Sequence, residues 1–433
     1  MAGGVTAPGG LHRPNPTATR VLLASMNAGG GHHALRDSFD AVLQRLDPAH
    51  QHVEPVVWTS ADHTVNAFYA ACVRYVPRFQ AHVVAISGQR WAMETAMKLA
   101  PHLLREATAL LRSQHFDVIT TTHALQCIVF SRARQALGLT TPLVTAVPDY
   151  GAPARGYYPA YPGLRPDALI VLEESTVEHY RSLGVPENRL HLSGFLTREP
   201  FVQVGSRLRS EGRAGVRLAL RAEVAESHPG FAGFALDRPT LLFLGGSAWT
   251  VKTEPLLEAL LADAELHRAA NLVVVAGRDA EFEARLRRRE GDGLHVFGFV
   301  SPPVLAALMG LADVPVLGSL APATLHELLE VGLGPLLLFH FIPGSERPHV
   351  GYIESQRLGI YQPGVQQMLS RIREVLGLAP ASEALAQARD GFRERARLLR
   401  SRSAERALQL PRFLESMAGR PVSTEPGPRA VAG

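Results

Sequence analysis

The sequence predicts an α/β protein made of two doubly wound domains, and three observations support this prediction. Apolar runs of strand length alternate with helical patterns, as in parallel sheets covered by helices. The alternation breaks over residues 202–238 and then starts again, which marks a domain junction there or shortly before. The chain has 433 residues, which is enough for two domains of ordinary size, each with its own core.

The first predicted domain begins with a strand, a glycine-rich turn and a helix. The strand covers residues 20–26, the turn follows at 27–33, and the helical pattern runs from 34 to about 46. Further apolar runs of strand length lie at 53–58, 117–121, 143–147 and 168–172. Helical patterns separate most of these runs, so we expect parallel strands joined by crossover helices.

The second predicted domain repeats this pattern, with strand runs at 240–244, 271–276, 295–299, 314–317 and 335–339. We expect domains at 19–200 and 201–385, a helix at 386–417 that packs back on the first domain, and disordered ends at 1–18 and 418–433. Two such domains facing each other form a cleft at the carboxyl ends of their strands, where α/β proteins bind ligands.

Composition narrows the class of partner. The net charge of +4 suits anionic substrates or anionic lipid but is too weak to indicate nucleic acid. Residues 1–18 lack the apolar core of a secretory signal, and no run is long and apolar enough to span a membrane. The two cysteines, Cys72 and Cys127, follow no metal-ligand spacing and are expected to be buried free thiols. We therefore expect a cytoplasmic protein, associated peripherally with the inner face of the cell membrane.

The segment 64–113 mixes aromatic and apolar residues with arginine and lysine. Such a mixture allows a helix to lie among anionic lipid headgroups. Amphipathic helices that cover a sheet show the same period, so the sequence leaves both interpretations open.

The turn Gly29-Gly30-Gly31-His32 lies between the first strand and the first helix. Glycines there let the backbone approach a ligand, and the helix N-terminus favours an anion. A histidine at this corner suits a general base, although a tight turn with a capping histidine is the alternative. The turn lacks the lysine of a P-loop and the last glycine of the dinucleotide fingerprint, so hydride transfer is disfavoured.

Several motifs occur in the order found in one enzyme family. The first half contains Gly29-Gly30-Gly31-His32, His123-Ala124-Leu125-Gln126, Val147-Pro148-Asp149, Gly156-Tyr157-Tyr158-Pro159 and Gly194–Phe201; the second contains Gly245-Gly246-Ser247, Val273–Arg278, Gly298-Phe299-Val300, Ala321–Glu327 and Ile342–Glu346. In this order the chain resembles the monogalactosyldiacylglycerol synthases and processive diacylglycerol glucosyltransferases. These are relatives of the peptidoglycan enzyme that adds N-acetylglucosamine to lipid I. The resemblance runs from about residue 20 to about residue 361.

The resemblance implies the GT-B architecture of two Rossmann-like domains, with the lipid acceptor on the first and a UDP-sugar on the second. Transfer in this family inverts the anomeric carbon, which requires a base for the acceptor hydroxyl. The resemblance makes His32 the candidate base and Asp149 the residue that orients either this base or the acceptor hydroxyl; a cap on the following turn is the alternative for Asp149. Gly29, Gly30, Gly31, His123 and Tyr157 are the candidates for the acceptor side.

On the donor side, the resemblance places Glu327 on the ribose hydroxyls, and Ala323 and Thr324 against the diphosphate. Glu346 and Ser345 become candidates for the sugar hydroxyls. Gly245, Gly246, Ser247, Arg278, Phe299 and Val300 complete the candidate donor site. The helix N-terminus rather than a metal is expected to hold the diphosphate, so we expect no cofactor and no metal site. The expected partners are a UDP-sugar, a membrane lipid acceptor and an anionic membrane surface, without nucleic acid.

Some family positions differ in this chain. The Gly-Pro-Gly of the family is Ala321-Pro322-Ala323 in this chain, and the third glycine of the nucleotide loop is Ser247. Ser345 stands where the family has a sugar-contacting Gln, and His349 stands where it has an Asn. The sequence therefore leaves the donor sugar open. A transferase of N-acetylhexosamine to a polyprenyl-linked or other glycolipid, a nucleotide-sugar 2-epimerase and a non-catalytic binder remain alternatives to a hexosyltransferase acting on diacylglycerol.

Overall fold

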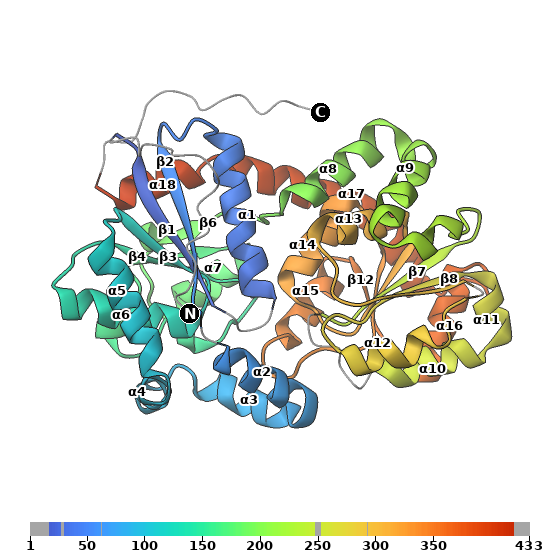
Figure 1. Cartoon of the computed structure of the whole chain (residues 1–433), viewed down its shortest axis with the longest axis horizontal. Coiled ribbons are helices and arrows are strands. Elements are labelled where there is room, and N and C mark those ends of the chain that lie inside the picture. Colours follow the sequence, from blue (N-terminus) through green and yellow to red (C-terminus); the bar gives the residue numbers. More distant parts are fainter. Residues whose placement is uncertain (1–16, 27–29, 62, 247–252, 292, 420–433) are drawn as a thin grey trace. The chain divides into compact units, whose positions relative to one another are not determined.

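The computed structural model describes residues 17–26, 30–61, 63–246, 253–291 and 293–419. Most of the two predicted disordered ends lies outside these residues. The chain divides into two compact units, which separate between Thr197 and Arg198 and again between Arg400 and Ser401. Residues from Ser401 onward group with the first unit, so that unit combines the N-terminal part of the chain with a stretch near its C-terminus (Figure 1).

Within the described residues, the strands form two parallel six-stranded sheets, one in each unit. This confirms the predicted α/β class. The first sheet has the order β2-β1-β3-β4-β5-β6, and its strands are β1 (Thr19–Ser25), β2 (Val53–Thr59), β3 (Val118–Thr121), β4 (Leu143–Ala146), β5 (Ala168–Val171) and β6 (Leu190–Leu192). The reversal of strand order beside β1 makes the ends of β1 and β3 a switch point, where α/β proteins bind ligands.

The first unit also contains the helices α1 (Gly31–Leu46), α2 (Thr64–Tyr75), α3 (Pro77–Ile86), α4 (Arg90–Leu99), α5 (Pro101–Ser113), α6 (Ala124–Leu137), α7 (Glu174–Ser182) and α18 (Leu410–Met417), with short 3-10 turns at Arg155–Tyr157, Pro162–Leu164 and Glu187–Arg189. The segment 64–113 therefore folds as the successive helices α2 to α5. Of these, α5 packs against α6 with buried Leu103, Ala107 and Leu110.

The second sheet has the order β12-β11-β10-β7-β8-β9, and its strands are β7 (Thr240–Leu244), β8 (Asn271–Val275), β9 (Leu294–Phe297), β10 (Val314–Leu317), β11 (Leu336–Leu338) and β12 (Gly359–Tyr361). Its helices are α8 (Glu199–Ser210), α9 (Gly212–Ser227), α10 (Glu254–Ala262), α11 (Ala264–Ala269), α12 (Ala280–Arg287), α13 (Pro302–Leu311), α14 (Pro322–Val331), α15 (Arg347–Ser355) and α16 (Val365–Val375), and a 3-10 turn covers Pro229–Gly233. The helix α17 (Glu383–Ala407) spans the point where the chain passes back to the first unit.

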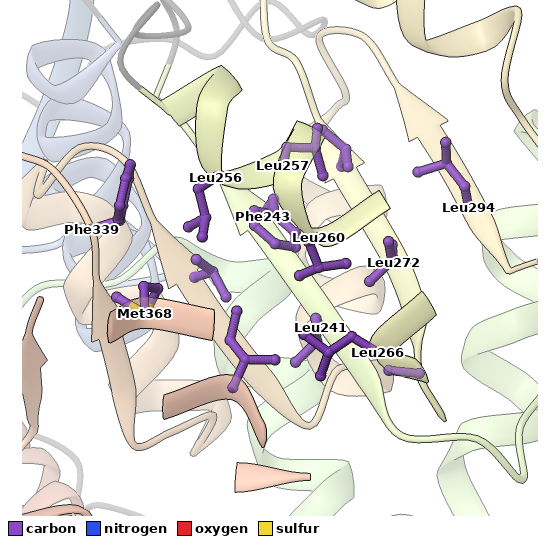
Figure 2. Close-up of a cluster of buried hydrophobic side chains, with 14 of the residues drawn as sticks. Leu241, Phe243, Leu256, Leu257, Leu260, Leu266, Leu272, Leu294, Phe339 and Met368 are labelled. Carbon is purple, nitrogen blue, oxygen red and sulfur yellow. The ribbon is translucent and has the colours of Figure 1, made fainter. Parts of the chain in front are cut away.

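The core of the second unit lies between its sheet and the helices α10 and α16. Phe243 of β7 lies beside Leu260 of α10, Leu241 of β7 lies beside Leu266 of α11, and Met368 of α16 belongs to the same cluster (Figure 2). These side chains are fully buried. Removing each from water contributes roughly 1.5–3 kcal/mol, so this cluster holds the sheet rigid beneath its loops.

The segment 202–238, for which the sequence suggested only a junction, forms the remainder of α8, then α9 and the 3-10 turn. Both helices pack against α13. The contact depends on Gly310, because a Cβ there would lie 2.6 Å from Leu220 Cδ1 and 2.9 Å from Val204 Cγ1. The segment is thus a structural support for the second sheet.

Candidate functional site

In the first unit, the candidate base lies in the first turn of α1, directly after the loop that follows β1. His32 Nδ1 lies 2.6 Å from the carbonyl oxygen of Thr122, the residue that follows β3. The Thr122 hydroxyl donates to the His32 carbonyl oxygen at 3.2 Å. Because β1 and β3 are neighbouring parallel strands, their carboxyl ends bring these residues together.

The contact with Thr122 settles which ring nitrogen of His32 carries the proton. A carbonyl oxygen only accepts, so Nδ1 is the donor, and the neutral ring carries its lone pair on Nε2. Burial lowers the pKa of His32, while the negative charge of Asp149 and the hydrogen bond to Thr122 raise it. The lowered pKa keeps His32 neutral at pH 7, which is the state that a base requires.

A second histidine lies beside His32. His123 is the N-cap of α6, and its Nδ1 accepts a hydrogen bond from Leu125 N at 3.0 Å. The two histidine rings meet edge to face, with centroids 4.5 Å apart. Burial, together with the charge that His32 would carry, holds the pKa of His123 well below its usual range.

The other residues predicted for the acceptor side lie in different settings. Gly30 caps the N-terminus of α1 and Gly31 is its first residue, while Gly29 lies outside the described residues. Asp149 is half-buried after β4. Tyr157 is buried in a core cluster with Val147 and Tyr180, where its ring supports the loop after β4.

In the second unit, Glu327 of α14 lies almost fully buried and pairs with Arg198, just before α8. Both Nε and Nη2 of Arg198 donate to Glu327 Oε1, with the Nε contact at 2.8 Å. Burial raises the pKa of Glu327 to about 7, although Arg198 lowers it. The role of Glu327 toward ribose stays a prediction, and in this structure its carboxylate ties α14 to the start of α8.

The N-terminus of α14 carries Ala323 and Thr324, the candidates for the diphosphate. The helix begins at Pro322, and Ala321 at the N-cap offers no side-chain acceptor to the first turn. Both candidates are half-buried. Backbone N–H groups of an N-terminus that lacks a side-chain cap, together with the helix dipole, favour an anion at this position.

Glu346, a candidate for the sugar hydroxyls, is buried in a network of hydrogen bonds. Its Oε1 accepts from Ser319 Oγ and its Oε2 from Ile342 N, both at 2.7 Å. Burial raises the pKa of Glu346, while hydrogen bonds from Leu320, Ser319 and Ile342 lower it. The carboxylate thus joins the loop after β11 to the end of β10, and the half-buried Ser345 lies beside it in sequence.

The loop after β7 approaches the same place. Gly246 has a φ of +76°, and a Cβ there would lie 3.2 Å from Ser319 Oγ. Gly245 directly follows β7, and Ser247 lies outside the described residues. Gly246, Ser319 and Glu346 therefore form one cluster at the carboxyl ends of neighbouring strands.

Arg278, Phe299 and Val300 belong to loops after β8 and β9. The guanidinium of Arg278 lies over the ring of Phe299, 4.6 Å from its centroid. Phe299 is 62% exposed, and Val300 is buried. An exposed ring beside an arginine offers a flat surface on which a planar ligand can stack.

The residues that sequence reasoning missed are Thr122, Arg198 and Ser319. Thr122 acts through its backbone carbonyl, which leaves no trace in a sequence. Arg198 lies within the segment Gly194–Phe201 that resembles the family link, so its presence, though not its pairing with Glu327, was visible.

Comparisons with known proteins show the fold. Neither a protein-family model nor a curated protein sequence matches the chain. A UDP-glucosyltransferase from Polygonum tinctorium aligns with a TM-score of 0.53 and 12% identity, covering 93% of this chain and 98% of its own. MnaA from S. aureus, solved with UDP, aligns with a TM-score of 0.56 and 9% identity, covering 94% and 100%. This chain has the GT-B fold.

A third similar structure is the UDP-GlcNAc 2-epimerase from Neisseria meningitidis, solved with UDP-GlcNAc. It aligns with a TM-score of 0.55 and 11% identity, covering 89% of this chain and 100% of its own. In the part of the GT-B chain that the structure describes, no helix has the length and apolar character needed to cross a membrane. Over the same residues, no three His, Cys, Asp or Glu side chains form a group that could hold a metal ion.

Proposed function

We propose that this protein is an inverting glycosyltransferase that moves a hexose from a UDP-sugar to a hydroxyl of diacylglycerol or a related membrane lipid. The observation that carries the proposal is the hydrogen bond from His32 Nδ1 to Thr122 O, which leaves a lone pair on Nε2. A base of this form, at a switch point of a GT-B sheet, suits removal of a proton from an alcohol.

The proposed reaction is a single displacement. His32 Nε2 takes the proton of the acceptor hydroxyl while the acceptor oxygen bonds to the anomeric carbon. The bond between that carbon and the diphosphate oxygen breaks, and UDP leaves with the electron pair. The N-terminus of α14 stabilises the negative charge on the diphosphate, and Phe299 with Arg278 stacks on the uracil.

The exposed surface of α2, α3 and α4 supports a lipid acceptor. Phe68, Phe79, Trp91 and Leu99 are between 51% and 80% exposed. Phe68 of α2 and Phe79 of α3 meet edge to face, on helices that lie beside each other (Figure 1). Exposed cations accompany them on α3, α4 and α5, namely Arg78, Lys98 and Arg105. Exposed aromatic rings beside cations suit the headgroup layer of an anionic membrane.

The test is release of UDP from UDP-galactose, UDP-glucose and UDP-N-acetylglucosamine, each with diacylglycerol in anionic vesicles, with products identified by mass spectrometry. We expect release with one donor, dependent on the lipid and matched by the mass of a hexosyl-diacylglycerol. Conversion of UDP-N-acetylglucosamine without lipid would instead indicate an epimerase. Vesicle binding with no reaction of any donor would indicate a non-catalytic binder.

A further inference from the structure

His32 and His123 carry their protons on different ring nitrogens. His32 donates from Nδ1 to a carbonyl, so its Nε2 is an acceptor. His123 accepts at Nδ1 from the backbone N–H of Leu125, so a neutral His123 carries its proton on Nε2. Among the described residues, neither Nε2 takes part in a hydrogen bond. Two adjacent rings thus offer one acceptor and one donor.

Capping alone does not account for a histidine at position 123. The cap of α6 uses only Nδ1, and asparagine, aspartate, serine or threonine would fill that role. Burial keeps His123 neutral over the physiological range, so its Nε2–H is a permanent donor without positive charge. A neutral donor is suited to an uncharged oxygen, such as that of an ester or a hydroxyl.

The oxygen that this donor contacts is constrained by the reaction. A hydrogen bond donated to the attacking oxygen would occupy a lone pair of that oxygen and lower its reactivity toward the anomeric carbon. An oxygen on the neighbouring carbon of the acceptor avoids this conflict. The ring centroids are 4.5 Å apart, so the two histidines lie within the span of one small headgroup.

We propose that His123 binds the acceptor, an inference that rests on the proposed function. Its Nε2–H donates to a second acceptor oxygen, which is bonded to the carbon next to the one that carries the hydroxyl deprotonated by His32. The acceptor class is then an alcohol with a vicinal oxygen, such as the glycerol of a diacylglycerol. A simple long-chain alcohol lacks this oxygen and leaves the donor without a partner.

The test separates the donor role from the cap. His123→Asn keeps a strong N-cap but is too short to place a donor where Nε2 lies. His123→Gln places an amide nitrogen near that position but caps poorly. For the wild type and both variants, one measures kcat/KM with diacylglycerol and with hexadecanol in the same vesicles, and the thermal midpoint of unfolding.

We expect His123→Asn to keep the wild-type thermal midpoint. Its ratio of kcat/KM for diacylglycerol to kcat/KM for hexadecanol should be about tenfold lower than that of the wild type. We expect His123→Gln to unfold at a lower temperature and to recover part of that preference. His123→Ser, a second capping variant, replaces His123→Asn if the latter does not fold, with the same expected loss.

Wild-type transfer to diacylglycerol together with an unchanged preference in the capping variant would show that His123 only caps α6, and would overturn this inference while leaving the proposed function intact. A wild type that transfers no sugar to either alcohol would overturn both.

Discussion

Replacing Arg198 by methionine should destabilise the second unit more at pH 8 than at pH 5. The pKa of Glu327 is raised from 4.5 to about 7 by burial, even with Arg198 beside it. At about 1.4 kcal/mol per unit, ionised Glu327 costs the folded state about 3.5 kcal/mol relative to the unfolded chain. Because the pKa of Glu327 is higher in the folded state than in the unfolded chain, the free energy of unfolding is not reduced below pH 4.5. It falls by this amount as the pH rises through 7.

Removing Arg198 takes away the charge and the hydrogen bonds that lower the pKa of Glu327, so the folded variant takes up a proton at pH 8. That uptake costs about 1.4 kcal/mol for the one unit between pH 7 and pH 8, and the missing hydrogen bonds cost about 1 kcal/mol more, which together lower the thermal midpoint by roughly 5–10 °C for a unit of this size. At pH 5 Glu327 is protonated, and the loss falls to about 1 kcal/mol for the missing hydrogen bonds. Differential scanning calorimetry at both pH values measures the difference.

Two further variants make the experiment specific. Arg198→Met combined with Glu327→Leu removes the buried carboxyl as well and should recover most of the midpoint lost at pH 8. Arg209→Met is the matched control, since Arg209 pairs with Glu330 across the same two helices, with its own side chain 39% exposed. We expect that change to cost under 1 kcal/mol. An equal loss for Arg198→Met at both pH values would refute the reasoning.

The remaining predictions concern the acceptor and donor sites and the scaffold. His32→Ala should lower transfer by about 10²–10⁴-fold and leave UDP affinity unchanged in calorimetry, and equal losses of both would argue against a base. Because the pKa of His32 lies below its usual range, wild-type kcat/KM should stay level above neutral pH and fall only in the acid range, as a pH–rate profile shows. Glu327→Gln should weaken UDP binding by about tenfold if this carboxylate holds the ribose, and unchanged affinity would remove that role. Replacing Phe79 and Trp91 by alanine should abolish sedimentation with anionic vesicles at moderate salt without changing UDP binding, whereas retained sedimentation would place the lipid surface elsewhere. Gly310→Ala should lower stability by about 1–3 kcal/mol through its clash with α8 and α9, and an unchanged thermal midpoint would show that these helices shift freely.

The sequence predicted the strands that combine length with continuous burial. β7 and β10 begin and end where the apolar runs do, because each is buried along its whole length. β6 and β12 were missed, since each covers only three residues and neither is fully buried. A three-residue strand takes its structure from the neighbour that it pairs with, and its own sequence carries little signal.

The sequence could predict the parts of the candidate site whose role follows from the type of residue. It could not predict the roles that depend on contacts between residues far apart in the chain. His32 was visible because it follows a glycine turn between a strand and a helix. Its neighbour His123 was visible as a motif residue, but the ring contact across 91 positions of chain depends on β1 and β3 pairing. The partner of Glu327 lies 129 residues away in sequence, so the ion pair required the fold.

The return of the chain to the first unit at Ser401 decides how the protein can be cut and recombined. Phe195 N donates to Ser403 Oγ at 2.9 Å, and Gly194 allows this approach because a Cβ there would lie 2.6 Å from Ser403 Cα. A fragment ending at residue 200 would therefore lack part of its own packing. Residues 198–400, by contrast, form one continuous cassette, which begins where the chain leaves the first unit and ends where the chain returns to it. Chimeras that exchange this cassette between related proteins would transplant the candidate nucleotide-binding residues while leaving the pair of histidines in its original scaffold.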